Sequence, residues 1–336
     1  MIKEAMFYKK GEAEEVDCYL CAHNCKIASG QLGFCQVRKN IQGILNTLVY
    51  GQVIAANIDP IEKKPLYHFL PGSRSFSIAT IGCNFRCDFC QNWQISQAAK
   101  EDNVPLACEL RPEQVIQEAK KGDCQSIAYT YTEPTIFFEY AYDCAKLAKE
   151  LGLKNIFVTN GYVSREALEV ISPYLDAVNI DLKSFSEEFY IKNCQGHLQP
   201  VLDSIKLAKE LGIWLEITTL IIPGQNDSES ELTSIAKFIA SLSKNIPWHL
   251  SRFHPDYKFF NQKPTPIKSL KKAEDIGKKA GLKYVYLGNV NQETNTYCDN
   301  CQKILLNRSH FDLIENNILE GKCKFCGKVI GGVYPV

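Results

Sequence analysis

Residues 81–93 read Ile-Gly-Cys-Asn-Phe-Arg-Cys-Asp-Phe-Cys-Gln-Asn-Trp and carry three closely spaced cysteines, Cys83, Cys87 and Cys90. They follow a short apolar run, Ser75 to Ile81, that is typical of a buried strand. Thiolates are soft ligands for iron–sulfur clusters or zinc, and a structural zinc site normally has four protein ligands. Three local cysteines therefore favour a 4Fe–4S cluster with one iron open to a cofactor or substrate. A zinc site completed by a distant His or Cys is the alternative.

Strand and helix patterns alternate from this point to about residue 290. Further apolar runs at 126–130, 155–159, 176–181, 213–222, 248–253 and 283–287 predict strands. Helical periodicity lies between them, and Ser164 is placed to cap the helix that follows 155–159. Such alternation predicts an α/β fold with a parallel sheet. Polar residues at the strand ends favour a partial or near-complete (β/α) barrel, in which those ends meet at one mouth.

Two more cysteine sets flank the predicted barrel. The C-terminal set forms two Cys-x2-Cys pairs, the usual spacing of a structural zinc ribbon; a second iron–sulfur cluster or rubredoxin-like iron is the alternative. Its members are Cys298, Cys301, Cys323 and Cys326. The N-terminal set has a less usual spacing, which leaves zinc and an auxiliary 4Fe–4S cluster equally open. Its members are Cys18, Cys21, Cys25 and Cys35.

These sets suggest three parts of the chain. We expect a cysteine-rich segment at 1–70, a barrel core at 71–292 and a four-cysteine ribbon at 293–336. A further cysteine, Cys194, lies beyond the fourth predicted strand. It is a candidate second redox or hydrogen-donor group, but a small semi-buried residue is the favoured interpretation.

The composition is that of an ordinary globular protein. The 336 residues are 45% hydrophobic, and 38 Lys and Arg balance 38 Asp and Glu. This balance argues against a general nucleic-acid binder and against a polybasic membrane tether. No apolar run approaches the roughly 18 residues of a membrane-spanning helix, and the first residues lack a signal-peptide pattern. With 15 cysteines that suit metals better than disulfides, we expect a cytoplasmic protein with neither a nucleic-acid nor a membrane partner.

The cysteine motif resembles a known signature. Cys-x3-Cys-x2-Cys after the first barrel strand resembles radical S-adenosylmethionine (SAM) enzymes. The segments Asp59–Phe69, Gly82–Trp93, Tyr131–Thr135 and Ser251–Pro255 resemble the radical SAM enzyme of the AmmeMemoRadiSam system. With the outer cysteine sets, this resemblance covers nearly the whole chain. The group is itself similar to activating enzymes of glycyl-radical enzymes, such as the pyruvate formate-lyase activase.

The resemblance implies an oxidoreductase. Its open iron would bind the methionyl part of SAM, and one electron would cleave SAM to methionine and a 5′-deoxyadenosyl radical. That radical would abstract a hydrogen from a protein or small-molecule substrate. The resemblance also implies a one-electron donor of flavodoxin or ferredoxin type, and partner proteins of the same system. The alternatives are an activating enzyme that makes a glycyl radical on a partner enzyme, and a non-catalytic protein with several zinc sites.

The resemblance further implies a set of residues around SAM. Glu133, in Tyr-Thr-Glu-Pro, stands where the family has a Gly-Gly-Glu-Pro segment that receives the amino group of SAM. Asp181 and Lys183 resemble an activase motif near the methionyl group. Glu133 and Asp181 together could hold an ammonium group or a monovalent cation. A structural salt bridge between Asp181 and Lys183 is the alternative.

The resemblance also implies SAM contacts for three further residues at strand ends. Thr218 begins a segment that resembles the strand backing the adenosine, where activases often carry Arg. Asn160 is expected to hydrogen-bond the ribose, although Asn-Gly is also an ordinary turn. His254, in Arg-Phe-His-Pro, matches an activase histidine near SAM. No residue is assigned to the reaction with the substrate itself.

Overall fold

The computed structural model describes residues 2–100, 106–291 and 293–334. Its centre is an eight-stranded sheet with the strand order β16-β15-β14-β13-β12-β11-β9-β8. Neighbours from β9 to β16 are parallel, and β8 pairs antiparallel with β9. The strands are β8 Ala55–Pro60, β9 Arg74–Ala79, β11 Ser126–Tyr129, β12 Lys154–Thr159, β13 Ala177–Asp181, β14 Trp214–Ile221, β15 Trp248–Arg252 and β16 Val285–Gly288.

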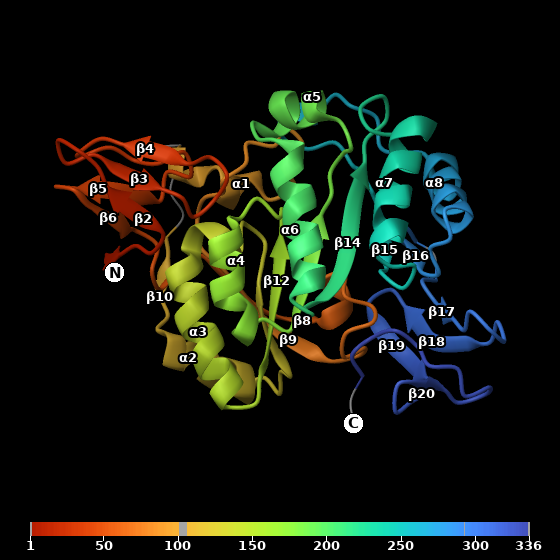
Figure 1. Ribbon diagram of the computed structural model, residues 1–336. Coiled ribbons are helices and arrows are strands. Elements are labelled where there is room, and N and C mark those ends of the chain that lie inside the picture. Colours follow the sequence, from red (N-terminus) through yellow and green to blue (C-terminus); the bar gives the residue numbers. More distant parts are fainter. Residues whose placement is uncertain (1, 101–105, 292, 335–336) are drawn as a thin grey trace.

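The helices that connect these strands cover one face of the sheet (Figure 1). They are α2 Pro112–Lys121, α3 Phe138–Glu150, α4 Arg165–Ile171, α6 Leu198–Glu210, α7 Glu229–Leu242 and α8 Ile267–Lys279. The short helices α1 Trp93–Ser96 and α5 Glu187–Phe189 lie in the loops that follow β9 and β13. The predicted α/β fold is confirmed as a partial barrel, because β8 and β16 stand at the two ends of the sheet. The predicted cap is also confirmed, since Ser164 Oγ accepts a hydrogen bond from Ala167 N at 3.3 Å.

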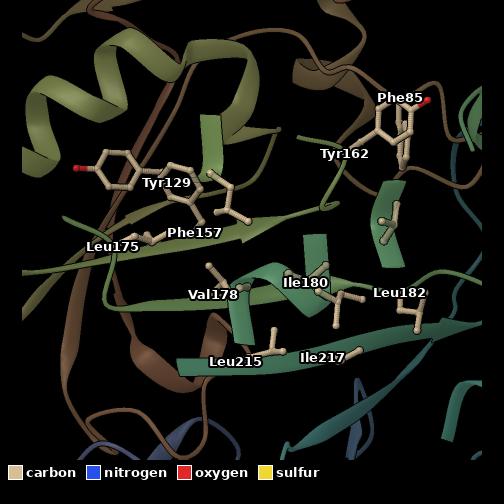
Figure 2. Packing of buried hydrophobic residues seen from close by; sticks show 14 of the residues in the cluster. Phe85, Tyr129, Phe157, Tyr162, Leu175, Val178, Ile180, Leu182, Leu215 and Ile217 are labelled. Atoms are coloured by element: carbon tan, nitrogen blue, oxygen red, sulfur yellow. The ribbon is translucent and has the colours of Figure 1, made fainter. Parts of the chain in front are cut away.

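Residue alternation on the strands separates the core from the barrel interior. Val178 and Ile180 of β13 belong to the main hydrophobic core, as do Leu215 and Ile217 of β14, and Figure 2 shows them packed together. The intervening residue Asn179 instead accepts a hydrogen bond from Thr218 Oγ1 at 2.8 Å, from the neighbouring strand. The strands therefore bury apolar side chains under the helices and turn polar side chains inward.

The N-terminal segment folds into two small antiparallel sheets beside the barrel (Figure 1). One contains β2 Tyr8–Lys10, β3 Val16–Cys18 and β4 Cys25–Ile27, and the other contains β1 Lys3–Glu4, β6 Ile44–Thr47 and β5 Arg38–Ile41. A buried ion pair between Arg38 and Glu139 of α3 joins this module to the barrel, and Met6 N donates to Glu139 at 2.7 Å. The short strands β7 Gln52–Val53 and β10 Cys108–Glu109 pair at the same side.

The C-terminal ribbon lies on the other side of the barrel (Figure 1). It contains β17 Thr296–Tyr297, β18 Ile304–Ser309, β19 Asp312–Asn316, β20 Ile318–Leu319 and β21 Lys322–Cys323. The buried Arg308 of β18 donates to Tyr67 O at 2.7 Å and lies 3.5 Å from the Glu62 carboxylate. The ribbon is thus fixed to residues 62–67, which directly precede the first parallel strand.

The three-part division of the chain remains a prediction, and β8 of the N-terminal segment already belongs to the central sheet. Across residues 2–100, 106–291 and 293–334, every helix is too short or too polar to cross a membrane.

Candidate active site

A cavity of about 440 Å³ opens at the carboxyl ends of the parallel strands. Pockets of this size hold small-molecule ligands. Its walls come from the cysteine loop after β9, from the residues that end or follow β11, β12 and β13, and from β14. The sequence-predicted residues in these walls are Cys83, Cys87, Cys90, Glu133, Asn160, Asp181, Lys183 and Thr218.

Two of the three cysteines of the loop, Cys83 and Cys90, have hydrogen-bond partners at sulfur. Phe85 N donates to Cys83 Sγ at 3.3 Å, and Asn160 Nδ2 lies 3.8 Å from the same sulfur. Cys90 Sγ is 3.2 Å from Ser96 Oγ. Donors directed at sulfur stabilise thiolates and the clusters that thiolates hold. This environment suits metal-bound cysteines.

The loop is held rigidly from its outer side. Asn84 Nδ2 donates to Tyr162 O at 2.8 Å, and Arg86 Nη1 donates to Cys83 O at 2.6 Å. The Phe85 and Tyr162 rings pack with centroids 4.9 Å apart (Figure 2). These contacts fix the positions of the sulfur ligands before any metal binds.

Burial favours the neutral, protonated form of these thiols. Burial raises the pKa of Cys83 well above its usual value, and the nearby Glu133 carboxylate raises it further. A hydrogen bond with Cys194, followed by burial, raises the pKa of Cys87 in the same direction. Binding an iron–sulfur cluster would replace these protons with positive metal charge. The residues present therefore fit a cluster held by Cys83, Cys87 and Cys90.

Glu133 is a buried carboxylate with several donors around it. Its Oε1 accepts hydrogen bonds from Thr135 N at 3.0 Å, Thr135 Oγ1 at 2.6 Å and Thr159 Oγ1 at 2.7 Å. Its Oε2 accepts from Asn160 N at 2.8 Å. Although these donors favour the charged form, burial raises the pKa of Glu133. The side chain therefore joins the ends of β11 and β12 and places a carboxylate in the cavity wall.

Asp181 and Lys183 form the predicted salt bridge, with Nζ and Oδ2 2.7 Å apart. Burial disfavours the Lys183 charge, but Asp181 and the neighbouring Cys87 and Cys194 thiols hold the pKa of Lys183 well above its usual value. Both residues also line the cavity. The Asp181–Lys183 pair can thus stabilise the fold and also bind a ligand. Its contact with SAM remains a prediction.

The other three predicted residues occupy different places. Thr218 lines the cavity and donates to Asn179, so its hydroxyl proton is already used. Asn160 lines it too, and its amide donates to Asn84 Oδ1 at 2.8 Å beside the Cys83 sulfur. His254 is exposed beyond β15 and is not among the residues that line the cavity. Their proposed contacts with SAM remain predictions.

Two cavity lysines were not predicted as site residues. Lys63 and Lys64 follow β8, line the cavity and donate to the Asp59 carboxylate at 2.8 and 2.6 Å. Burial lowers the pKa of Lys64 to about 8. Although burial opposes it, hydrogen bonds from these lysines and Tyr131 hold the pKa of Asp59 well below its usual value. Both lysines belong to the segment Asp59–Phe69, which carries part of the family resemblance, but the resemblance assigned no role to them.

Cys194 is closer to the site than the favoured interpretation implied. It ends a π-helical turn, Tyr190–Cys194, and its side chain hydrogen-bonds to Cys87. Cys194 O also accepts a hydrogen bond from Arg86 N at 2.8 Å. π-helical turns are frequent at functional sites. The Cys194 thiol is therefore a direct neighbour of a predicted cluster ligand.

The C-terminal cysteines gather around a single point. All four Sγ atoms lie within 4.8 Å of one another, and the Cys298–Cys326 and Cys301–Cys323 pairs are each 3.7 Å apart. Four thiolates at about 2.3 Å from one zinc ion would be about 3.8 Å from each other. The set thus has the geometry of one tetrahedral ion, and zinc as its occupant remains a prediction.

Comparisons with known proteins define the class. Residues 77–235 match the family model of the Radical SAM superfamily, which covers the cysteine loop and the strands that carry Glu133, Asp181 and Thr218. The chain therefore contains a Radical SAM domain, and this family implies a 4Fe–4S cluster and SAM.

Individual relatives extend this result. The chain is 45% identical over 334 residues to the uncharacterized protein MJ0808 of Methanocaldococcus jannaschii, covering 98% of this chain and 99% of that one. It is 22% identical over 176 residues to the pyruvate formate-lyase-activating enzyme of Clostridium pasteurianum, covering 52% of this chain and 72% of that one. The fold is similar to Streptococcus suis SuiB bound to S-adenosylmethionine, with a TM-score of 0.51 and 13% identity over 68% of this chain and 53% of that one.

Proposed function

We propose that this protein cleaves SAM reductively at a 4Fe–4S cluster held by Cys83, Cys87 and Cys90, and uses the resulting 5′-deoxyadenosyl radical to take a hydrogen atom from a substrate. One observation carries the proposal. The three cysteines share a cavity at the barrel mouth with a buried carboxylate, Glu133, and with the Asp181–Lys183 pair. When bound, the cluster supplies the single electron that breaks the sulfonium bond.

The side chains of the cavity supply binding and orientation. The methionyl part of SAM carries one ammonium and one carboxylate group. Glu133 and Asp181 offer negative charge to the ammonium, while Lys183 offers positive charge to the carboxylate. Glu133 is already held by hydrogen bonds at the end of β12, and Asp181 is already paired with Lys183. These groups would therefore bind SAM with little reorganisation. The enclosing barrel keeps water from a reactive radical.

The substrate class is proposed to be protein. Similarity to an enzyme named as the activator of pyruvate formate-lyase supports this, as does the resemblance of Asp59–Phe69 to the AmmeMemoRadiSam enzyme. We place the protein in that system, with partner proteins of the same system as the substrate or its carrier. Generation of a glycyl radical on a partner enzyme is the narrower form of this proposal. A flavodoxin or ferredoxin would supply the electron.

The experiment measures 5′-deoxyadenosine. Anaerobically reconstituted protein is reduced with dithionite, mixed with SAM and analysed by mass spectrometry. We expect 5′-deoxyadenosine from the wild type and from Cys108→Ala, which changes an exposed cysteine outside the cavity, and none from Cys87→Ala. Zinc in place of iron at Cys83, Cys87 and Cys90 would contradict the proposal and favour the non-catalytic multi-zinc alternative.

A further inference from the structure

The four N-terminal cysteines gather at one end of the β2-β3-β4 sheet. Cys18 and Cys25 are directly paired across β3 and β4, and Cys21 lies in the turn between these strands. A Cβ atom placed on Gly33, two residues before Cys35, would lie 3.9 Å from Cys25 Sγ. The loop before β5, which carries Cys35, therefore lies against the β3-β4 hairpin. The β3-β4 hairpin therefore supplies three thiols, and the loop before β5 brings a fourth thiol to the same end of the sheet.

Their spacing differs from that of the C-terminal set. In the described part of the chain, Cys298, Cys301, Cys323 and Cys326 are the one set of at least three potential ligands with all ligand atoms within 4.8 Å of one another. Four thiolates on a single zinc ion must be that close. In a 4Fe–4S cluster, each thiolate binds a different iron at a corner of the cube, so the sulfur atoms stand farther apart. The N-terminal set is wider than a single zinc ion requires, which favours the cluster.

The N-terminal set is also in direct contact with the loop that carries Cys83. A Cβ atom placed on Gly82 would lie 3.2 Å from Cys35 O. His23 Nε2 lies 2.6 Å from Asn84 O, and its ring stacks on Phe34 with centroids 4.0 Å apart. The two cysteine loops therefore pack backbone to backbone.

Arg86 bridges the same two loops. Its Nη1 donates to Cys83 O at 2.6 Å, its Nη2 donates to Phe34 O, and its guanidinium lies over the Phe34 ring. Burial lowers the pKa of Arg86, but the thiols of Cys83 and Cys35 act in the opposite direction. One buried cation thus lies between the two cysteine sets, where it would stabilise the added negative charge of a reduced cluster on either side.

The other side of the N-terminal set faces the surface. Cys21 and Ala22 line a groove of about 860 Å³ between this module and helices α4 and α6. The groove wall carries both signs of charge, including Lys9, Arg165 and Asp203. A soluble electron carrier can approach Cys21 here, whereas Cys87 is buried inside the barrel.

We propose that Cys18, Cys21, Cys25 and Cys35 hold a second 4Fe–4S cluster, which carries electrons from a one-electron donor at the surface groove to the cluster at Cys83, Cys87 and Cys90. The donor loses one electron and the N-terminal cluster is reduced by one electron. That electron then reduces the inner cluster, so the outer one returns to its oxidised state. The relay rests on the proposed radical SAM function, whereas the presence of the second cluster does not.

Metal analysis tests the second cluster directly. The variant Cys83→Ala/Cys87→Ala/Cys90→Ala leaves the N-terminal set intact. After anaerobic reconstitution we expect about four irons and four sulfides per chain in this variant, against about eight of each in the wild type. Zinc without iron or sulfide in this variant would overturn the proposal, and this outcome does not depend on SAM cleavage.

The converse variant is Cys18→Ala/Cys21→Ala, for which we also expect about four irons per chain. Cys124→Ala/Cys144→Ala is the matched control, because it removes two buried cysteines outside all three sets and should keep about eight. A Cys18→Ala/Cys21→Ala protein that folds and still contains eight irons would contradict the assignment of ligands.

Electron paramagnetic resonance tests the relay. Two reduced clusters in packed loops should interact magnetically, so we expect a broadened spectrum from the fully reduced wild type. Each cysteine variant should give the sharp signal of one isolated cluster. A wild-type spectrum equal to the sum of the two variant spectra would overturn the relay. Two clusters without 5′-deoxyadenosine formation would instead reject the proposed function and leave the second cluster in place.

Discussion

Glu133 concentrates several interactions on one buried carboxylate, which makes it sensitive to the smallest chemical change. The variant Glu133→Gln keeps the shape but turns one acceptor oxygen into an NH2 group, which then faces donors from Thr135, Thr159 or Asn160. We expect the free energy of unfolding to fall by about 1–3 kcal/mol, with weaker SAM binding. Denaturant unfolding and calorimetric titration with SAM measure the two effects.

The control for this variant is Glu118→Gln, at an exposed position of α2. It should leave both quantities unchanged. Unchanged stability in Glu133→Gln would mean that the hydrogen bonds around Glu133 contribute little to the native state.

The Cys194 thiol is hydrogen-bonded to the Cys87 thiol, and it would become a donor to Cys87 when that sulfur is held as a thiolate by the cluster. Hydrogen bonds to cluster sulfurs raise reduction potentials. A weak hydrogen bond contributes about 0.5–1 kcal/mol, which is about 20–40 mV for one electron. We therefore expect Cys194→Ala to keep its iron and to lower the potential of the inner cluster by about that amount, measured by redox titration with paramagnetic resonance.

Cys144→Ala is the control for this measurement, since Cys144 is buried in α3 away from the cavity. A potential that rises in Cys194→Ala, or that moves equally in the control, would contradict a hydrogen bond from Cys194 to the ligand.

At the scale of elements, Gly82 decides how closely the N-terminal module approaches the cysteine loop. Its φ is +97°, and a Cβ atom there would lie 2.8 Å from Val37 Cγ1. We expect Gly82→Ala to lower the free energy of unfolding by about 1–2 kcal/mol from backbone strain, with about 1–3 kcal/mol more from overpacking. Thermal and denaturant unfolding measure the loss.

Gly152→Ala separates the two contributions. Gly152 also has a positive φ, +78°, but nothing lies within 4 Å of the position of its Cβ, so only the backbone strain should be seen. Equal losses in the two variants would show that the module and the loop do not press against Gly82.

The elements of the barrel were largely predictable because parallel strands buried on both faces appear as apolar runs. The partial barrel is confirmed, and each predicted strand from 75–81 to 283–287 has a counterpart from β9 to β16. The segment 134–151 was predicted as one helix, whereas it begins with a 3-10 turn, Pro134–Phe137, before α3. The π-helical turn at Tyr190–Cys194 was not predicted, because tertiary contacts and not periodicity fix it.

The residues of the site could be predicted only where they follow the parallel strands of the barrel. Cys83, Glu133 and Asp181 could be placed at one mouth because parallel strands end on the same side. Lys63 and Lys64 could not, because they come from a 3-10 turn after the antiparallel strand β8. Antiparallel pairing of β8 with β9 was not visible in the apolar pattern. It places Pro60 beside Arg74, so the chain leaves β8 at the start of β9, and the lysines reach the cavity from that end.

At the scale of the whole molecule, His68 joins the barrel to the C-terminal tail. Its Nδ1 donates to Gly331 O at 2.8 Å and its Nε2 accepts from Tyr286 Oη at 2.6 Å. Burial lowers the pKa of His68 from 6.5 to about 4. Because the unfolded chain then binds more protons than the native one, stability should fall as the pH drops below 6.5. The full effect is about 3 kcal/mol, approached near pH 4.

The test compares the pH dependence of unfolding in the wild type and in His68→Asn between pH 7 and pH 5. The variant should be less stable at pH 7, because it loses two hydrogen bonds, but its stability should decline less on acidification. Parallel curves for the two proteins would show that folding does not lower the pKa of His68.

The contact between Arg308 and Tyr67 joins residues that are 241 positions apart in the chain, which imposes an order on biosynthesis. A ribosome delivers the N-terminal cysteines first and the barrel strands next. The ribbon that holds residues 62–67, next to the cavity lysines Lys63 and Lys64, comes last. Long-range contacts of this kind form only when both partners exist. The nascent protein thus acquires the cysteines of its N-terminal and inner sets early, but the wall of its reaction chamber is fixed only after the ribbon has been synthesised.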